Sequence, residues 1–401
     1  MPIEFAERIR RIPVYPTASG YDLGADIAML ASNESPFGPV PEVFDAVQRV
    51  LSGVNRYPDP TYSALREALS DRYGIPPARI ALGNGSCDIL LAAGEALLEP
   101  GAEIVYAWPA FSEYPHLAAA SGARAIEVPL DADDRHDLDA MAEELTVATR
   151  LVLVCNPNNP TSTSIGLDRV AAFLERVPSH VCVVLDEAYC EFSLSLGDPY
   201  ASVELLRSWP NLVLLRTFSK VYGLAALRVG YALCGENSFR AAVDVVRQPF
   251  HLNIAAQAAA VEALRHQDAV ERRVTETLAA RLTLEQDVRD LGLWVAESDG
   301  NFIWVRLPED ADEASIVKGL GERGVLVRSG ASLGREGALR VTVGRPRENS
   351  RFVAALNELM YAGASARRSA ADARLEPQPV RYVQHLWLPL RLAIYLGARS
   401  V

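Results

Sequence analysis

The sequence predicts an α/β protein with a large domain built on a mostly parallel sheet and a smaller α+β domain. Three observations support this fold class. Continuous apolar runs that end in polar residues recur between residues 80 and 219, as expected for strands buried on both faces of a parallel sheet. Helix-like segments separate these runs, and such alternation builds an open sheet. After about residue 260 the alternation stops, which indicates a second domain.

The expected elements of the first part follow the chain in order. Residues 1–35 are expected to form an N-terminal arm, and residues 36–260 the large domain. Apolar positions recur at helical spacing over 41–51 and 61–72, which predicts two helices before the sheet. The strands of the sheet are expected at 80–82, 104–108, 123–130, 150–156, 182–189 and 211–219.

The second part has a different pattern. A long charged helix is expected over 259–292, close to the start of a smaller domain that covers residues 261–363. Further elements of this domain are strands at 302–307, 325–328 and 338–344 and a helix at 312–323. Residues 364–401 form a tail whose structure the sequence does not predict.

Composition narrows the classes of function. The 401 residues are 49% hydrophobic and 22% charged, with a formal net charge of −12, so we expect a soluble protein that binds neither nucleic acid nor a membrane. The N-terminus lacks the apolar core of a signal peptide, and no apolar run is long enough to span a bilayer. Five scattered cysteines and six unpaired histidines predict reduced thiols in the cytoplasm and no metal site.

Lysine is nearly absent from the chain. Only Lys220 and Lys318 occur among the 39 basic residues, so the other 37 are arginines. A lysine amine can lose its proton and form an imine with a carbonyl, which arginine cannot do. Lys318 lies in an amphipathic helical segment and is expected to be a solvated surface residue. Lys220 lies in RTFSKVYGLAALRVG, directly after an expected strand, and is the candidate for imine chemistry.

Polar clusters follow five of the expected strands. Ligands of an open α/β sheet bind at the carboxyl ends of its strands, so these clusters are expected to meet along one edge. In chain order they read GNGSCD, PAFSEY, NPNNPTS, DEAY and TFSK.

The residue types in these clusters suggest one ligand. The Lys220 amine suits a carbonyl, and Asp186 at a buried strand end could keep a pyridinium nitrogen protonated. The segment GNGSCD precedes a helix, so its backbone N–H groups and Ser86 suit an anion. Arg228 could neutralise a phosphate. An aldehyde, a ring and a phosphate together describe pyridoxal 5′-phosphate.

From about residue 30 to 360 the chain resembles the pyridoxal-phosphate-dependent aminotransferases of fold type I, and within class II the histidinol-phosphate aminotransferase branch. In this order and spacing the motifs that carry the resemblance are highly specific. They are ASNESPFGP, RYPDP, GNGSCD, NPNNPTS, DEAY, RTFSKVYGLAALRVG and ALRVTVG.

The resemblance implies catalytic roles for three residues. Lys220 would form the internal aldimine and then move the proton between Cα and the cofactor. Asp186 would pair with the pyridine nitrogen. Tyr189, together with Asn159, would donate hydrogen bonds to the 3′ oxygen of the ring. Phe111 would stack on the ring face.

The resemblance also assigns the phosphate and substrate contacts. Phosphate would be bound by Ser86, the backbone at Cys87, Thr217, Ser219 and Arg228. Tyr57 in RYPDP would reach that phosphate from the second subunit of a homodimer. The substrate contacts would be Arg340 for the α-carboxylate as a bidentate pair, Arg328 as a further anion receptor, and Asn33.

The chain departs from the family pattern at several positions. Ser162 stands in NPNNPTS where the family usually has Gly, and Cys87 stands where an acidic residue is common. Phe37 replaces a tyrosine whose hydroxyl could contact a substrate phosphate, which weakens the assignment to histidinol phosphate. The tail after about residue 364 has no recognised counterpart.

The expected reaction is transamination between histidinol phosphate and 2-oxoglutarate. An aromatic amino acid aminotransferase is the first alternative, and a pyridoxal-phosphate decarboxylase similar to the threonine-phosphate enzymes is the second. A non-catalytic regulator with this fold is disfavoured because both Lys220 and Asp186 are present.

Overall fold

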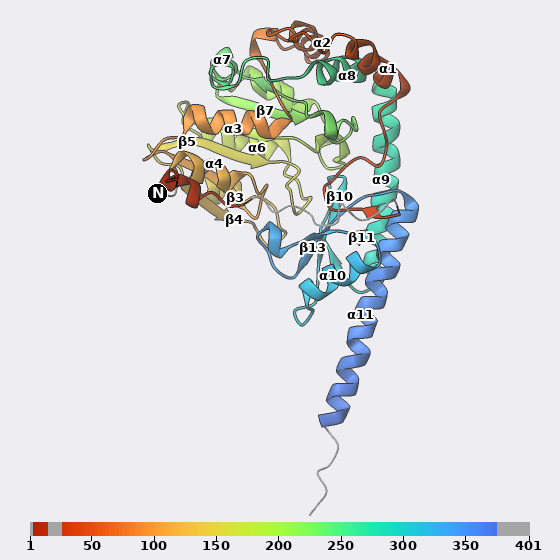
Figure 1. The fold of residues 1–401 in the computed structure, drawn as a ribbon. Coiled ribbons are helices and arrows are strands. Elements are labelled where there is room, and N and C mark those ends of the chain that lie inside the picture. The colour runs from red at the N-terminus through yellow and green to blue at the C-terminus, as the bar shows by residue number, and fades with distance from the viewer. Residues whose placement is uncertain (1–2, 15–25, 375–401) are drawn as a thin grey trace, which may run out of the picture. The chain divides into compact units, whose positions relative to one another are not determined.

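A seven-stranded sheet positions the predicted site, and Figure 1 shows this sheet together with the helices that pack against it. Its strand order is β2-β8-β7-β6-β5-β3-β4. All neighbouring strands from β7 to β4 pair in parallel, whereas β8 is antiparallel to both β7 and β2, which confirms the predicted mostly parallel sheet. The strands are β2 (Ile80–Gly83), β3 (Glu103–Trp108), β4 (Arg124–Pro129), β5 (Thr149–Cys155), β6 (Cys182–Asp186), β7 (Leu212–Thr217) and β8 (Gly230–Cys234).

The structure is a computed structural model that describes residues 3–14 and 26–374. The chain divides into two units, residues 1–359 and residues 360–401, and both main sheets belong to the first. The helix α11 (Pro346–Arg374) begins in the first unit. Residues 375–401, which make up most of the predicted tail, lie outside the described residues.

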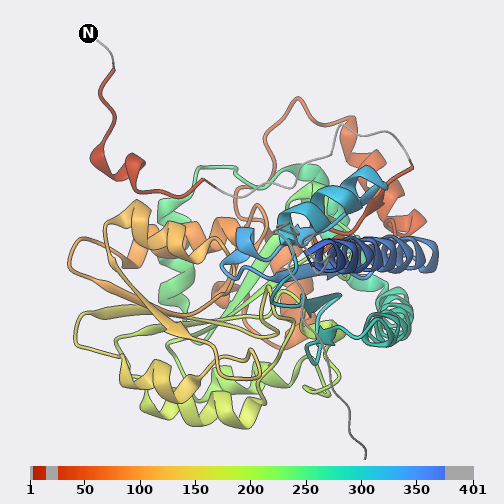
Figure 2. The same cartoon turned by 90° about the horizontal axis from the view of Figure 1, so that it is seen from below.

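Helices cover both faces of the large sheet (Figure 2). Val183 and Leu185 of β6 belong to one apolar cluster, whereas Val184 belongs to another, because successive side chains of a strand point to opposite faces. The first cluster includes residues of α1 (Pro41–Leu51), α2 (Ser63–Tyr73), α5 (Leu138–Glu143), α6 (Leu167–Arg176) and α8 (Ile254–Arg265). The second includes residues of α3 (Ser86–Leu97), α4 (Tyr114–Ser121) and α7 (Asn237–Val246).

A second, antiparallel sheet follows in the order β12-β13-β10-β9. The prediction of one continuous helix over 259–292 is wrong. His266 (φ −106°, ψ 58°) divides this stretch into α8 and α9 (Gln267–Asp290). The elements of this part are α9 (Gln267–Asp290), β9 (Trp294–Val295), β10 (Phe302–Arg306), α10 (Glu313–Glu322), β12 (Arg328–Ser329) and β13 (Ala338–Thr342). None of the helices among the described residues combines the length and apolar composition that a membrane span requires.

The N-terminal segment is joined to this C-terminal part. The short strand β1 (Ala28–Met29) pairs in parallel with β11 (Val325–Leu326), and Leu30 is buried. The amide N–H of Thr342 in β13 donates to the Leu30 carbonyl at 2.9 Å. These contacts bring the following residues, 31–34, to the carboxyl edge of the large sheet.

A buried carboxylate links the two sheets. Asp134 lies in a loop of the large-sheet part and has no exposed surface. Its Oδ2 pairs with Arg306 of β10 at 2.7 Å, and its Oδ1 pairs with Arg335. Two arginine partners offset the cost of removing the Asp134 carboxylate from water, so this contact fixes the loop against the smaller sheet.

Candidate active site

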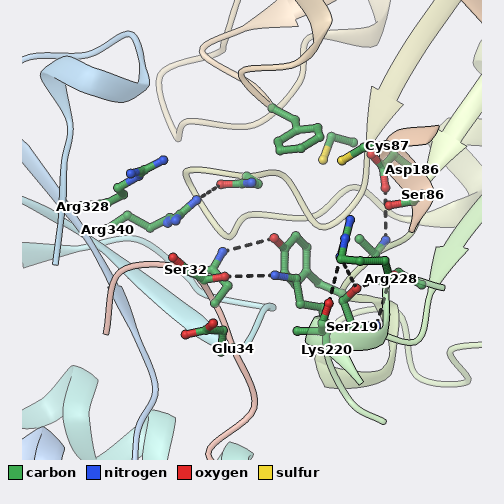
Figure 3. Close-up of a pocket in the computed structure, with 18 of the residues that line it drawn as sticks. Ser32, Glu34, Ser86, Cys87, Asp186, Ser219, Lys220, Arg228, Arg328 and Arg340 are labelled. Atoms are coloured by element: carbon green, nitrogen blue, oxygen red, sulfur yellow. Dashed lines mark hydrogen bonds between the residues drawn. The ribbon is translucent and has the colours of Figure 1, made fainter. Parts of the chain in front are cut away.

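A cavity of about 410 Å³ lies where the carboxyl ends of the large sheet face the smaller sheet (Figure 3). The structure brings every predicted site residue except Tyr57 to its wall. Those residues are Asn33, Ser86, Cys87, Phe111, Asn159, Asp186, Tyr189, Thr217, Ser219, Lys220, Arg228, Arg328 and Arg340. Residues from elements far apart in the sequence therefore share one cavity.

Lys220 follows β7 and points its amine into the cavity. Its Nζ donates to the Ser32 carbonyl at 3.0 Å and lies 5.5 Å from the centre of the Tyr189 ring. Burial of the ammonium group, with a further contribution from the positive charge of Arg340, lowers the pKa of Lys220 to about 8. On the order of a tenth of the amine is therefore neutral at pH 7, and the neutral form is the one that a nucleophile or base requires.

Asp186 ends β6, the middle strand of the large sheet, and only 3% of its surface is exposed. Its carboxylate accepts a hydrogen bond from the Tyr114 hydroxyl at 3.0 Å and from the Ala188 amide at 3.3 Å. Burial raises the pKa of Asp186 to about 6, although these two hydrogen bonds oppose the rise. A cationic N–H group placed against this carboxylate would relieve the cost of its burial.

Tyr114 is a site residue that the sequence analysis missed. It is the last residue of PAFSEY and begins α4, where its fully buried ring reads as an ordinary core aromatic. Its hydroxyl reaches Asp186, and its ring packs edge-on against Phe111 at 5.8 Å. The sequence signal for Tyr114 is its place at the end of PAFSEY, a cluster expected at the carboxyl end of a strand. Ser32 and Glu34 also line the cavity and were not predicted.

A hydrogen-bond network joins the N-terminal segment to the predicted ring contacts. Asn33, at φ 52°, donates through Nδ2 to the Tyr189 hydroxyl at 3.2 Å. Its amide N–H donates to the Thr342 hydroxyl at 2.9 Å. Arg340 of β13 donates to Asn159 Oδ1 at 2.5 Å and to the Ala31 carbonyl at 2.6 Å. Arg340 and Asn159 are thus held together in the cavity wall.

The loop before α3 and the segment after β7 form a corner lined by hydrogen-bond donors. Arg228, at φ 56°, donates to Ser219 Oγ at 3.3 Å and to the Asn84 carbonyl at 3.4 Å. The Ser219 hydroxyl also accepts from Thr217 at 3.0 Å. A Cβ added to Gly85 (φ 78°) would lie 2.4 Å from Arg228 Nη2, so only glycine allows this approach. Three side-chain donors therefore meet at the start of a helix, where anions bind favourably.

Two arginines face each other in the wall formed by the smaller sheet. Arg328 and Arg340 are direct partners across β12 and β13, and both are buried. Figure 3 shows them on the side opposite Ser86, Cys87 and Asp186. The cavity therefore has one group of hydrogen-bond donors beside α3 and a pair of arginines in the smaller sheet, with Lys220 between them.

These features fit the expected cofactor. The buried acid suits its ring nitrogen, the amine of lowered pKa suits its aldehyde, and the corner of hydrogen-bond donors suits its phosphate.

Two residues singled out in the sequence lie elsewhere in this chain. Tyr57 is 81% exposed and stacks on Phe250, with the ring centres 4.5 Å apart. Phe37 lies 5.4 Å below the Arg345 guanidinium and beside a separate hollow between α9 and α11. Phe37 therefore does not line the cavity of its own chain, and the hydroxyl that it lacks does not affect substrate binding there.

We predict that Asp186 makes the cofactor-free protein less stable as the pH rises. The pKa is about 6 in the folded protein against an ordinary value of 3.8, so the folded state binds this proton more tightly. The stabilising contribution is complete below pH 3.8 and is lost as the pH rises through 6. The unfolding free energy of the wild type relative to Asp186→Asn should fall by roughly 3 kcal/mol in total from well below pH 3.8 to well above pH 6.

Urea denaturation at several pH values measures this difference. Asp71→Asn, at an exposed aspartate of α2, is the matched control and should follow the wild type. A difference between wild type and Asp186→Asn that stays constant, or grows with pH, would contradict the raised pKa.

Comparison with known proteins agrees with this geometry. The family model for aminotransferase class I and II matches residues 25–356. Histidinol-phosphate aminotransferase 2 of Ralstonia nicotianae is 45% identical over 350 residues, which cover 87% of this chain and 93% of that protein. An aromatic amino acid aminotransferase of Thermobifida fusca is 45% identical over 81% of this chain and 88% of its own.

A solved aminotransferase structure is also similar to this chain. The histidinol-phosphate aminotransferase of Sinorhizobium meliloti, in complex with pyridoxal-5′-phosphate, has a TM-score of 0.78 and 29% identity. The match covers 89% of this chain and 98% of that one. The chain belongs to the class I and II aminotransferase family.

Proposed function

We propose that this protein is a pyridoxal-phosphate-dependent aminotransferase that transfers the amino group of histidinol phosphate to 2-oxoglutarate. The observation that carries the choice of substrate is the buried cross-strand pair of Arg328 and Arg340. Like charges directly opposite each other on neighbouring strands are unfavourable, so a dianion between them is favoured. A phosphate monoester carries almost two negative charges at neutral pH, and the two carboxylates of 2-oxoglutarate also need cationic partners.

The cofactor contacts follow from the cavity. Bound pyridoxal phosphate supplies an electron sink that weakens the Cα–H bond of the amine substrate. Asp186, oriented by Tyr114, would hold a proton on the ring nitrogen. Tyr189 and Asn159 would donate to the ring oxygen, and Phe111 would cover the ring face. The phosphate would be bound by Ser86, the backbone at Cys87, Thr217, Ser219 and Arg228.

Lys220 would perform the proton transfer. Its lowered pKa allows the neutral amine to bind the cofactor aldehyde. Once released from the aldehyde, the same amine would take the proton from the substrate Cα. The Tyr189 ring, 5.5 Å from Nζ, and the Ser32 carbonyl would orient the amine when it carries a proton.

An aromatic amino acid aminotransferase is the second candidate. Its support is the Thermobifida fusca relative, which matches as strongly in identity as the Ralstonia protein. Arg340 alone would suffice for a single α-carboxylate, and Arg328 would then contribute less. The decarboxylase alternative differs in its product, because it would release carbon dioxide.

A cytoplasmic homodimer completes the proposal. Large apolar side chains are exposed along α1 and the loop that follows it, namely Phe44, Leu51, Val54 and Tyr57. Exposed apolar surface of this kind is typical of protein interfaces. We propose that this surface is covered by a second copy and that Tyr57 contacts the phosphate of that copy. The described cysteines are unpaired, which is compatible with a reducing compartment.

The two substrates can be distinguished by kinetics. We predict that kcat/KM with 2-oxoglutarate is higher for histidinol phosphate than for phenylalanine or tyrosine by about tenfold or more. Arg328→Gln should lower kcat/KM for histidinol phosphate by about 10- to 100-fold, because a charge-assisted contact to the dianion is lost. The effect on phenylalanine should be smaller, since its single carboxylate can use Arg340.

Lys318→Gln is the matched control, because it removes a positive charge from the exposed face of α10. It should leave both substrates unchanged. Faster turnover of phenylalanine, or equal losses for both substrates in Arg328→Gln, would favour the aromatic enzyme. Release of carbon dioxide from threonine phosphate would identify the decarboxylase.

The contribution of Tyr57 across the dimer can be tested by complementation. Tyr57→Ala and Lys220→Ala subunits, each defective alone, would be co-expressed. If Tyr57 acts on the other subunit, a mixed dimer has one site with both Lys220 and Tyr57, so random mixing restores about a quarter of the sites. No recovery of activity in verified mixed dimers would show that Tyr57 does not act across the interface.

A further inference from the structure

Ser162 has an unusual position in the loop that carries Asn159. It is fully buried and adopts φ 64°, a left-handed conformation that costs a non-glycine residue conformational free energy. Its amide N–H donates to the Asn158 carbonyl at 2.8 Å, which closes a tight turn. Glycine would adopt this conformation without strain, so the presence of a serine here points to a use for its hydroxyl.

The Ser162 hydroxyl connects this loop to the segment that enters the smaller sheet. Its Oγ accepts a hydrogen bond from the Gly300 amide at 2.8 Å and donates one to the Phe302 carbonyl at 2.8 Å. The Ser162 carbonyl accepts from the Asp299 amide at 2.6 Å. One residue thus makes three contacts with residues 299–302, which are more than 130 positions away in the sequence.

Gly300 is matched to this contact. A Cβ added there would lie 2.6 Å from the Phe302 ring and 3.0 Å from Ser162 Oγ. Any larger residue would have to displace one of them, because such separations are below normal van der Waals contact. The hydroxyl of Ser162 and the absence of a side chain at Gly300 therefore form one complementary contact.

Phe302 carries this contact to the reaction centre. Its ring packs edge-on against the Tyr189 ring, with the centres 4.9 Å apart, and lies 5.6 Å from the Arg340 guanidinium. Arg340 in turn donates to Asn159, three residues before Ser162. These contacts form a closed ring of interactions. Ser162 hydrogen-bonds to the Phe302 backbone, the Phe302 ring lies against the Arg340 guanidinium, and Arg340 donates to Asn159 in the loop that contains Ser162.

We propose that Ser162 is a positioning residue that fixes the anion receptor Arg340 relative to the cofactor-contacting loop through its hydrogen bonds to Gly300 and Phe302. Ser162 touches neither substrate nor cofactor in this role. It lets the smaller sheet and the loop move as one body, so that the acid substrate meets Arg340 at a fixed distance from Lys220. The inference depends on the proposed transaminase activity but not on which amino donor the enzyme prefers.

Two substitutions test the role of the hydroxyl. Ser162→Ala removes both hydrogen bonds and keeps the backbone cost, whereas Ser162→Gly removes both and relieves it. In the holoenzyme, both should raise KM for 2-oxoglutarate and glutamate about 3- to 10-fold and change kcat less than about twofold. Hydrogen exchange at the Gly300 amide, measured on peptides covering residues 299–303, should accelerate in both variants.

Ser121→Ala is the matched control, because the Ser121 hydroxyl donates to two carbonyls of its own helix, Leu117 and Ala118. It should leave KM and Gly300 exchange unchanged. If exchange accelerates while KM stays constant, the hydrogen bonds exist but do not position Arg340, and the proposal is overturned. A rise in KM in Ser162→Ala that is absent in Ser162→Gly would assign the effect to backbone strain instead.

Protein stability and function are separated by the same data. If Ser162→Ala fails to fold, Ser162→Gly still provides the test, since glycine favours the observed φ. A wild-type holoenzyme that shows no turnover with any amino donor would instead count against the proposed transamination. Gly300 exchange does not depend on that outcome.

Discussion

Burial of the Asp186 carboxylate at the centre of the large sheet is the constraint on which the site depends. A carboxylate removed from water is costly unless charge or hydrogen bonds compensate. Among the described residues Tyr114 and Ala188 supply two neutral donors, and the positive charge of Lys220 compensates in part. The raised pKa of Asp186 records the part that remains uncompensated. A protonated ring nitrogen supplies the missing partner, so the fold holds the carboxylate ready for a cationic heterocycle.

The rest of the cavity follows from the same burial. Lys220 shares the low-polarity environment, and for an amine burial has the opposite effect, because it lowers the pKa and favours the neutral form. Acid and base are thus shifted towards neutral pH by one cause. The smaller sheet completes the cavity with Arg328 and Arg340, and contacts at Asp134 and Asn33 join it to the larger one. Binding of anions is thereby linked to the relative position of the two sheets.

Much of the fold was predictable because strands buried on both faces produce continuous apolar runs, as in β5, β6 and β7. The polar residues after these runs were correctly expected in one cavity. Other features depend on tertiary contacts that leave no local pattern. The break at His266 lies within a continuous helical periodicity, β1 has only two residues, and the Tyr114–Asp186 contact joins residues 72 positions apart. Tyr57 would act only in a dimer, which one sequence does not display.

The most direct test of the central claim uses the scarcity of lysine. Borohydride reduction of the holoenzyme fixes a lysine-bound pyridoxal group covalently, and peptide mass spectrometry then locates it. Only Lys220 and Lys318 are available as lysine sites. The account predicts the modification on the peptide that contains Lys220, with Lys318 unmodified and the signal absent from Lys220→Ala. Modification of Lys318 alone, or of neither lysine in a protein that retains the cofactor, would contradict it.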